Sequence, residues 1–593
     1  MDTSPTTAHD HLRQTIDDEI KVSEQVTQQL KCRRNDVLAP ISRLPPETLA
    51  EIFSLLLFTD NDYSKGITYL ERIRVTSVCH RWREVALRFP YLWNHINFTI
   101  LTPAGITEIL ARAKRVPLHF EVEITPWNKA RFNAFRTQLD AHISHTRHIT
   151  ISGEFQTALE QLVSPAPALV SLNLRQPFIS SRYIIPDFLF NGTAPNLTHL
   201  ELRGCSIGWK SPLLKGLRTL KIWTPSAHTK PALEDWLAAL NEMSQLTTLL
   251  LTNATPSVSV DNPLMSEPQK TAILPSLTRL DIAASAKDCA LALAHLVLPA
   301  LISLRVTSRS QSWDGDDVRI LVPYVARHAH GPQDAAPLQT ILLNGESRYA
   351  QIIAWTVPDA DVEVYNFISL HMAAIFARLV FTVKLDSEWP NGTDTAVFDA
   401  MLSNLPLNAI STLSAQNNTR LSKQVWLSHV PRLTVLKRVL LVPTAVRAFR
   451  KMLEEDPPPK GLPRLPQLTK LILSKVSLTA PRTYHLRDML VKRKEHGAPL
   501  EDLDLRTCIV TERAIQLLSE TVGNVQSPVD TLKVGLPAFF NWESTVGPFD
   551  EEERTDDDEC DNGPGPWYDP ILMSDDEDDE DEDEDEFDDS DDE

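Results

Sequence analysis

Glycine is scarce in this chain, which has 18 glycines in 593 residues. The sequence contains no GxxxxGKS/T or GxGxxG pattern, in which glycine lets the backbone approach a phosphate, and no GxSxG or HExxH pattern. These absences remove the common sequence patterns for nucleotide binding, serine hydrolysis and zinc proteolysis. We therefore predict that the chain is not an enzyme and has no cofactor.

Cysteine is also rare, and no two cysteines form a CxxC pair. This scatter favours reduced thiols in a cytosolic or nuclear protein over a disulfide framework or a zinc site. The spacing of His142, His145 and His148 is compatible with a metal only if the three share one face. They lie near the start of an expected strand, where this spacing does not bring them together, so we predict no metal site. The six cysteines are Cys32, Cys79, Cys205, Cys289, Cys508 and Cys560.

Long apolar runs are missing as well. The longest, residues 290–304, is interrupted by His295 and Pro299 and is too short to cross a bilayer. The N-terminus has no basic start followed by an apolar stretch, so we expect no secretory signal. The sequence predicts a cytoplasmic or nuclear protein, or one found in both compartments, without a membrane partner.

Negative charge is concentrated at the C-terminus. The net charge is −21, but residues 549–593 hold 27 acidic residues and one basic residue, which leaves the rest at about +5. We predict a disordered acidic tail over residues 547–593, because like charges repel and little apolar surface is available for burial. It is expected either to attract basic proteins or only to aid solubility, and it disfavours nucleic-acid binding. Ser574 and Ser590, each followed by DDE, are candidate phosphorylation sites.

Apolar residues near the N-terminus predict two helices. The first follows Pro45-Pro46, a pair suited to a first helical turn, and the second ends before Pro90. A module of this size cannot bury all of these side chains alone, so we expect a partner to cover some of them. The apolar residues at helical spacing are Leu49, Ile52, Phe53, Leu56 and Leu57 in the first helix and Val75, Val78, Cys79, Trp82, Val85 and Ala86 in the second.

The order LPPE (44–47), IF (52–53), VCxxW (78–82) and PxLW (90–93) resembles an F-box. F-boxes are helical modules that bind the Skp adaptor of Skp–cullin–F-box ubiquitin ligases. The connection at residues 59–74 is longer and more polar than in a compact F-box, and the N-terminal arrangement resembles F-box proteins of mushroom-forming fungi. The resemblance implies adaptor contacts through Leu44-Pro45 and the following helix. The adaptor-binding candidates are Leu44, Pro45, Pro46, Ile52, Phe53, Val75, Cys79, Trp82 and Trp93.

The segment before this module is polar but amphipathic. Residues 10–38 contain apolar side chains near helical spacing and no glycine or proline, which predicts one helix. We expect this helix to lie on the F-box, with a self-pairing coiled coil as the alternative.

A short motif, LxxLxL, returns ten times after residue 98. Its alternation predicts a strand with one buried face, and a proline just ahead of eight copies ends the preceding segment. Return segments such as 231–242 and 512–521 read as helices. The array resembles a degenerate leucine-rich-repeat solenoid, in which only stacked units bury their leucines. The copies begin at Leu169, Leu197, Leu217, Leu246, Leu277, Leu301, Leu338, Leu468, Leu500 and Val529.

Two details refine this repeat prediction. Cys205 and Cys508 complete LxxLxLxxCxL, where the resemblance implies a structural bond to neighbouring turn backbones. Between residues 345 and 466 the motif is faint, and we expect irregular repeats there, with strands near 380–385 and 433–440.

The predicted fold is α/β, with four segments. They are an N-terminal helix, partly disordered (1–39), an F-box (40–98), an irregular leucine-rich-repeat solenoid (99–546) and a disordered acidic tail (547–593). Residues between the repeat leucines point to the opposite face of each strand. Basic and aromatic side chains on that face are typical of protein interfaces. The alternative is an ordinary solvated surface. The target-binding candidates are Arg175, Arg203, Lys221, Trp223, Arg305 and Arg506.

These features predict a substrate-recognition subunit of a Skp–cullin–F-box ubiquitin ligase that binds the Skp adaptor and an unknown protein target. One alternative is a non-enzymatic acidic leucine-rich protein that binds histones or other basic proteins; residues 44–93 argue against it. A second alternative is a hydrolase within residues 345–465.

Overall fold

The protein is described here from a computed structural model. The residues that the structure describes are 5–55, 74–125, 128–177, 183–224, 230–259, 268–310, 316–331, 335–346, 349–358, 377–385, 393–417, 419, 421–454 and 464–528. The predicted acidic tail, the tenth repeat at Val529 and the polar connection at 59–73 lie outside these residues.

Short helices form the first part of the chain. Pro40 and Pro90 each stand at the start of a 3-10 helix, and Cys79 caps the helix that follows it. The elements are α1 (Pro5–Leu38), η1 (Pro40–Arg43), α2 (Pro46–Leu55), η2 (Val75–Ser77), α4 (His80–Arg88) and η3 (Pro90–Trp93).

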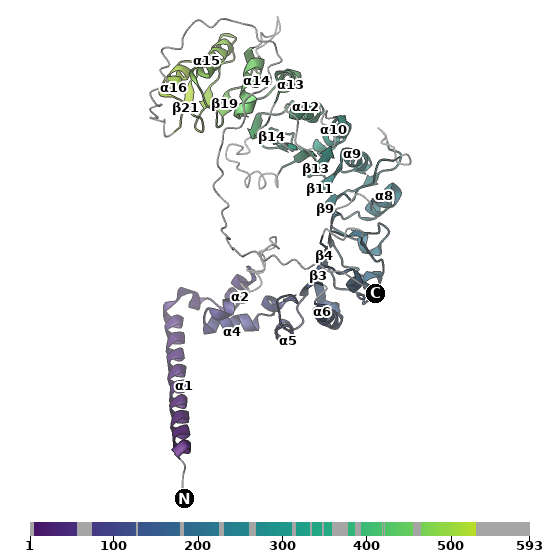
Figure 1. Cartoon of the computed structure of the whole chain (residues 1–593), viewed down its shortest axis with the longest axis vertical. Coiled ribbons are helices and arrows are strands. Elements are labelled where there is room, and N and C mark those ends of the chain that lie inside the picture. Colours follow the sequence, from purple (N-terminus) through teal and green to yellow (C-terminus); the bar gives the residue numbers. More distant parts are fainter. Residues whose placement is uncertain are drawn as a thin grey trace, which may run out of the picture. The chain divides into compact units, whose positions relative to one another are not determined.

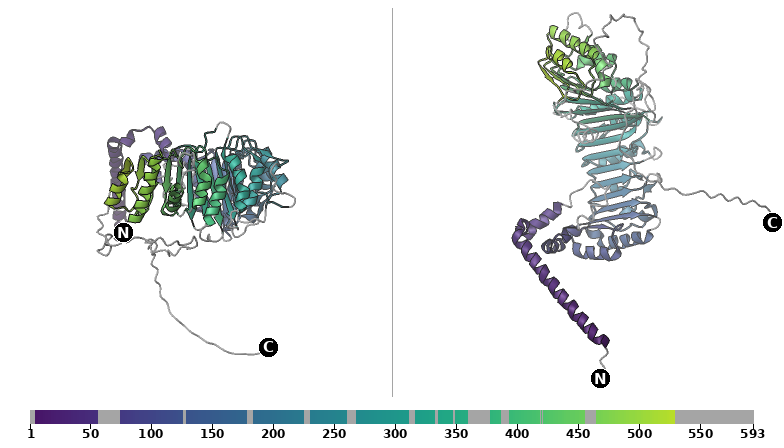
Figure 2. Two further views of the ribbon diagram at one scale, coloured as in Figure 1. Left: turned by 90° about the horizontal axis from the view of Figure 1, so that it is seen from above. Right: turned by 60° about the vertical axis from the view of Figure 1, so that its left-hand side comes forward.

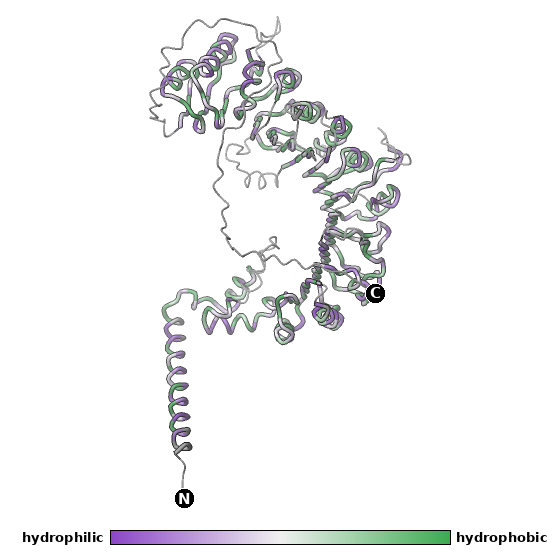
Figure 3. The backbone as a smooth tube through the Cα atoms, viewed as in Figure 1, coloured by the Kyte–Doolittle hydropathy of each residue, from purple (hydrophilic) through white to green (hydrophobic). Residues whose placement is uncertain are grey.

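Helix α1 forms as the sequence predicts but does not pack on the F-box helices. All of its side chains that the structure describes are exposed, including Leu12, Ile20 and Leu30. Figure 3 shows hydrophilic and hydrophobic residues alternating along this helix. The expectation that α1 lies on the predicted F-box is therefore wrong, because helical spacing indicates an apolar face without indicating what that face contacts.

One large sheet dominates the rest of the described chain. Seventeen described strands belong to it, and Figure 2 shows them running side by side. From one edge to the other their order is β1 (His95–Asn97), β2 (Leu118–Ile124), β3 (Thr146–Gly153), β4 (Ser171–Arg175), β6 (His199–Arg203), β8 (Thr219–Trp223), β9 (Thr248–Thr252), β11 (Arg279–Ser285), β13 (Ser303–Ser310), β16 (Leu379–Leu385), β15 (Tyr349–Trp355), β14 (Thr340–Glu346), β17 (Thr412–Asn417), β18 (Arg438–Leu441), β19 (Lys470–Leu473), β20 (Asp502–Asp504) and β21 (Asn524–Gln526).

The helices between strands pack on one face of this sheet. Figure 1 shows α8, α9 and α10 together on the same side of β9, β11 and β13. Of the described helices, none is both long and apolar enough to span a membrane. The helices after η3 are α5 (Pro103–Ala113), α6 (Lys129–His142), α7 (Gln156–Leu159), α8 (Leu233–Glu242), α9 (Ala286–Ala294), α10 (Asp316–Ala329), α12 (Thr393–Ser403), α13 (Lys423–His429), α14 (Pro443–Glu454), α15 (Ala480–Glu495) and α16 (Glu512–Ser519).

The repeat leucines stack in register, as the motif predicts. Leu172, Leu200 and Leu220 occupy equivalent positions on β4, β6 and β8 and are buried beneath the helices. Each strand alone would leave its leucines in water, so the core exists only through stacking. The alternate residues lie on the opposite face of the sheet, which we call the far face.

The first strand already lies within the predicted F-box segment. Residues 95–97 of β1 pair in parallel with 119–121 of β2. The sheet therefore begins before the boundary predicted at residue 98, because the chain that follows η3 is already extended beside the first repeat.

The faint region departs from a simple repeat array. Strand β16 lies next to β13, whereas β14, which precedes β16 in the chain, lies two strands further along and pairs with β17. Strand β15 joins them and is antiparallel to both. The copy at Leu338 is thus a strand but not the spatial neighbour of the copy at Leu301. A sequence motif fixes which face of a strand is buried, but it does not fix the order of the strands.

Candidate adaptor-binding and target-binding surfaces

Helices α2 and α4 are joined by a small aromatic core. The rings of Phe53 and Trp82 lie 5.1 Å apart between centroids, and Leu49 is fully buried beside them. The Arg81 guanidinium donates a hydrogen bond to the carbonyl oxygen of Leu44, which fixes the chain just ahead of α2. The indole nitrogen of Trp93 donates to the carbonyl oxygen of Ala86 at 2.8 Å.

Three of the predicted adaptor-binding residues are core residues. Phe53, Val75 and Trp93 have exposed fractions of 0%, 6% and 3%. They cannot contact a partner in this conformation and instead support the module. Helical spacing identifies apolar side chains without dividing them between the core and the surface, and the burial of these three assigns them to the core.

The other candidates face outward to different degrees. Pro45 and Pro46 are exposed, and Ile52 is 36% exposed. Three partly buried candidates remain, namely Leu44, Cys79 and Trp82.

Sequence reasoning missed three exposed apolar side chains of the same module. Leu55 is 66% exposed, Val78 is 60% exposed and Ile41 is 40% exposed. A signal was available in α2, because Leu49 and Phe53 form one apolar face while Ile52 and Leu55, three residues apart, form another. A helix that is apolar on two faces needs cover on both.

Comparison with known proteins agrees with this geometry. Residues 41–99 match the F-box-like family, so the helical module is an F-box-like domain. No curated protein matches the chain. Among solved structures, the complex of Rad7 and Elc1 in yeast is similar at 13% identity, covering 87% of this chain and 96% of that chain with a TM-score of 0.24. At such a low TM-score the two chains do not superpose as a whole, and the fold is defined by the strands and helices described above.

On the far face, three of the six target-binding candidates surround one carboxylate, and a fourth packs against one of those three. Glu201 Oε1 lies 3.0 Å from Arg203 Nε and 3.6 Å from Arg175 Nη2, and Glu201 Oε2 lies 3.4 Å from Lys221 Nζ. The Arg203 guanidinium lies over the Trp223 ring at 4.5 Å from the centroid. We call these five residues the Glu201 cluster.

The other two candidates lie elsewhere. Arg305 is on β13, where burial first, and then the neighbouring Arg279, lower its pKa. Arg506 follows β20 and forms an ion pair with Asp504 at 2.6 Å. The structure therefore does not unite all six residues in one site.

A row of histidines lies beside the Glu201 cluster, at one end of the strands. His95, His119 and His148 occupy paired positions on β1, β2 and β3, and the rings of His95 and His119 stack with centroids 4.3 Å apart. His95 Nε2 lies 2.8 Å from Glu121 Oε2. Burial alone would raise the pKa of Glu121, but the hydrogen bond and charge of His95, together with a hydrogen bond to Asn97 and the charge of Arg175, lower that pKa.

The three histidines of the HxxHxxH spacing lie on different elements and do not share one face. His142 ends α6 and lies against His145, whereas His148 is on β3 and contacts His119. In the part of the chain that the structure describes, no group of three His, Cys, Asp or Glu residues is arranged to hold a metal.

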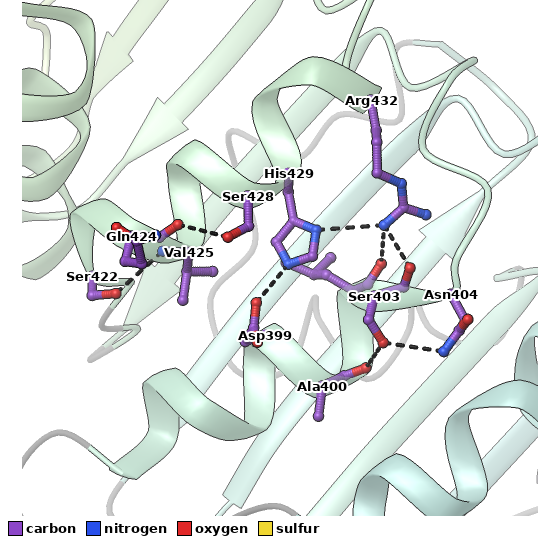
Figure 4. A network of polar contacts seen from close by, with 11 residues as sticks. Asp399, Ala400, Ser403, Asn404, Ser422, Gln424, Val425, Ser428, His429 and Arg432 are labelled. Carbon is purple, nitrogen blue, oxygen red and sulfur yellow. Dashed lines mark hydrogen bonds and ion pairs between the residues drawn. The ribbon is translucent and has the colours of Figure 1, made fainter. Parts of the chain in front are cut away.

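Residues 345–465 contain an aspartate–histidine pair, shown in Figure 4, in which His429 is buried and Asp399 is partly exposed. His429 Nε2 donates to Asp399 Oδ1 at 2.9 Å, and Arg432 Nη1 donates to His429 Nδ1 at 3.4 Å. Both ring nitrogens are therefore engaged. The hydroxyl of Ser428 donates to a backbone carbonyl, and that of Ser422 accepts from the backbone N–H of Val425. The network joins α12 to α13 and presents no serine to the imidazole.

The repeat cysteines have structural contacts. The Cys508 thiol donates to the carbonyl oxygen of Leu473 on the neighbouring strand at 3.0 Å. Cys205 is buried at the equivalent place in its own repeat. Cys79, Cys205, Cys289 and Cys508, the four cysteines whose side chains are described, are free thiols. The two candidate phosphorylation sites, Ser574 and Ser590, lie outside the described residues.

Proposed function

We propose that this chain is a substrate-recognition subunit of a Skp–cullin–F-box ubiquitin ligase, in which the F-box-like domain binds the Skp adaptor and the repeat sheet binds a protein target. Ubiquitin transfer would be carried out by other subunits. The chain would act by proximity, because tethering a target beside the transferring subunit raises its effective concentration.

The observation that carries this proposal is a set of exposed apolar side chains on the F-box-like domain. Ile52 and Leu55 on α2, with Ile41 and Val78 on the flanking segments, expose much of their surface although the module has an ordered core below them. Interfaces concentrate their energy in a few apolar anchors, each worth about 2 kcal/mol or more on truncation. Exposed anchors on an F-box-like domain support an adaptor as the partner.

The far face of the sheet supports the second half of the proposal. Its Glu201 cluster combines Arg and Trp, which are the residue types enriched at interface anchors. The cluster lies on adjacent strands of a sheet whose other face is filled by core leucines. A rigid support of this kind holds polar side chains in place for a target.

A pull-down from native extract tests the proposal. Full-length chain is expected to recover the Skp adaptor, and the double substitution of Leu44 and Pro45 by Ala is expected to lose it. The matched control is Ile302→Asp, at a position 62% exposed on the repeat region, which should recover the adaptor as the unmodified chain does.

The opposite pattern would favour the histone-binding alternative. Recovery of histones without the adaptor, unaffected by the Leu44 and Pro45 changes but abolished by deleting residues 575–593, would contradict the ligase proposal.

A further inference from the structure

The geometry of the Glu201 cluster points to a class of target. We propose that the far face of β4, β6 and β8 binds protein segments rich in unmodified Asp and Glu. This inference rests on the proposed target-binding role of the far face and specifies its chemistry.

The cluster carries an excess of positive charge in a fixed arrangement. Three cations, Arg175, Arg203 and Lys221, surround the single carboxylate of Glu201 at 3.0 to 3.6 Å. Glu201 is the most enclosed of the four, with a side chain 17% exposed, while that of Arg203 is 45% exposed and that of Lys221 35% exposed. The carboxylate therefore orients the cations from the more buried side of the cluster. The cluster presents a net charge of about two positive units to solvent.

The point at which the three cations converge is already occupied by the Glu201 carboxylate. Arg175, Arg203 and Trp223 occupy the same register on three consecutive parallel strands, which are spaced about 4.8 Å apart. A phosphate group is usually held by several donors converging on one centre. Here that centre holds Glu201, so the outward sides of Arg175 and Arg203, on neighbouring strands, fit carboxylates that are spread along a segment lying across the strands.

Trp223 adds an apolar contact to this row. The Arg203 guanidinium covers one side of its ring, 4.5 Å from the centroid, and this contact holds both side chains in place. Because the two side chains are already ordered, they lose little further entropy when a partner binds. An extended acidic segment would pair with Arg203 and place a neighbouring side chain against the indole edge.

Nucleic acid fits the same surface less well. A nucleic-acid site needs a continuous track of cations along the phosphate backbone. The far face instead carries Glu121 and Glu123 on β2 and Asp281 on β11, on either side of the cluster. Carboxylates therefore interrupt the positive charge on both sides of the β4–β8 patch, which matches a short acidic stretch of a protein better than a continuous phosphate backbone.

Fluorescence anisotropy on the full chain tests the proposal directly. The probe is a labelled 12-residue peptide that alternates Asp and Glu with Ser, and the comparison peptide has Asn and Gln in place of the acids. We expect the acidic probe to bind, the neutral one not to bind, and affinity to fall as salt rises. The same titration is run on the chain lacking residues 575–593, because the acidic residues of that segment would compete with the probe for the same cations.

Three substitutions make the test specific to the cluster. Arg203→Gln and Lys221→Gln are each expected to weaken binding about two- to fivefold, which is the usual range for partly exposed ion pairs. Glu201→Gln is expected to strengthen binding by a similar factor, because it removes the competing carboxylate. The control is Lys215→Gln, a 70% exposed lysine that pairs with Glu242 away from the strands and should leave affinity unchanged.

Several results would overturn the proposal. These are equal binding of the neutral peptide, binding only when the serines are phosphorylated, preference for a labelled single-stranded oligonucleotide, or no response of affinity to Glu201→Gln and Lys221→Gln. Adaptor capture is measured on the same preparations. Loss of peptide binding with adaptor capture intact refutes this inference alone, whereas failed adaptor capture by the unmodified chain refutes the proposed ligase role.

Discussion

The aromatic rings of Phe53 and Trp82 hold α2 against α4, with their centroids 5.1 Å apart. Phe53 is fully buried, while Ile52, its neighbour in sequence, faces outward on the same helix. One turn of α2 therefore serves two purposes, because one side chain builds the domain and the next remains available to a partner.

This division predicts separable effects of two substitutions. Phe53→Ala should destabilise the F-box-like domain by about 3–5 kcal/mol, since it leaves a cavity between α2 and α4. Ile52→Ala should cost well under about 1 kcal/mol, because its side chain already contacts water. Hydrogen exchange of peptides from α2 and α4 measures both, and equal protection in the two variants would contradict the assignment of Phe53 to the core.

The stability of the repeat region should depend on pH through His429. Burial is the largest effect on this imidazole and lowers its pKa in the folded state, although Asp399 opposes the shift. The unfolded chain, with a pKa of about 6.5 at this residue, then takes up the proton first as pH falls. The contribution of His429 to stability is therefore full above about pH 6.5 and is lost progressively below it.

The matched variant for this effect is His429→Gln, whose amide can donate to Asp399 and accept from Arg432 without titrating. Its unfolding midpoint should fall less than that of the unmodified chain between pH 7.5 and pH 5.5. His328 is a second buried histidine with a lowered pKa, so some pH dependence should remain in the variant. Identical pH profiles for the two chains would refute the role assigned to His429.

Arg432 should stabilise the end of α12. Its guanidinium donates to the carbonyl oxygens of Leu402 at 2.8 Å and Ser403 at 2.7 Å, which are among the carbonyls that a helix leaves unpaired at its C-terminus. Arg432→Met should destabilise the repeat region by about 1–3 kcal/mol. Arg447→Met, at an exposed position on α14, is the control and should be nearly neutral in urea unfolding.

The buried thiols should resist alkylation in the folded protein. Burial raises the pKa of Cys205 and of Cys289 to about 12 and that of Cys508 to about 11. Because the thiolate is the reactive form, iodoacetamide at pH 8 should leave these three unmodified until the chain is denatured. Peptide mass mapping reads out each site, and rapid native labelling of Cys508 would contradict its bond to the Leu473 carbonyl.

Much of the fold could be predicted from the sequence because the patterns that indicate it are local. Alternating leucines fixed the buried face of each strand, and proline positions separated strands from helices. The placement of β16 beside β13 was not accessible, since strand order depends on which edges meet in space. The α1 helix was predicted correctly, but its packing was not, because periodicity reports a helix and leaves its contacts open.

The candidate sites could be predicted only in part, because sequence patterns do not determine which elements meet in space. Motif order located the F-box-like domain, but the inward position of Trp93 and the outward position of Val78 depend on how η3 and α4 turn relative to α2. On the far face, alternation placed Arg203, Lys221 and Trp223 on one side, whereas the central role of Glu201 follows only from strand register. The resemblance to fungal F-box proteins stays a prediction.

Direct binding of purified Skp adaptor to the full chain tests the central claim. The account predicts saturable binding in calorimetry that Leu55→Asp weakens at least tenfold, because a charge would replace an exposed apolar anchor. Ile302→Asp should bind as the unmodified chain does, and both variants should unfold at the same temperature as it does. Absence of binding by the unmodified chain, or equal affinity of the Leu55→Asp variant, would contradict the account.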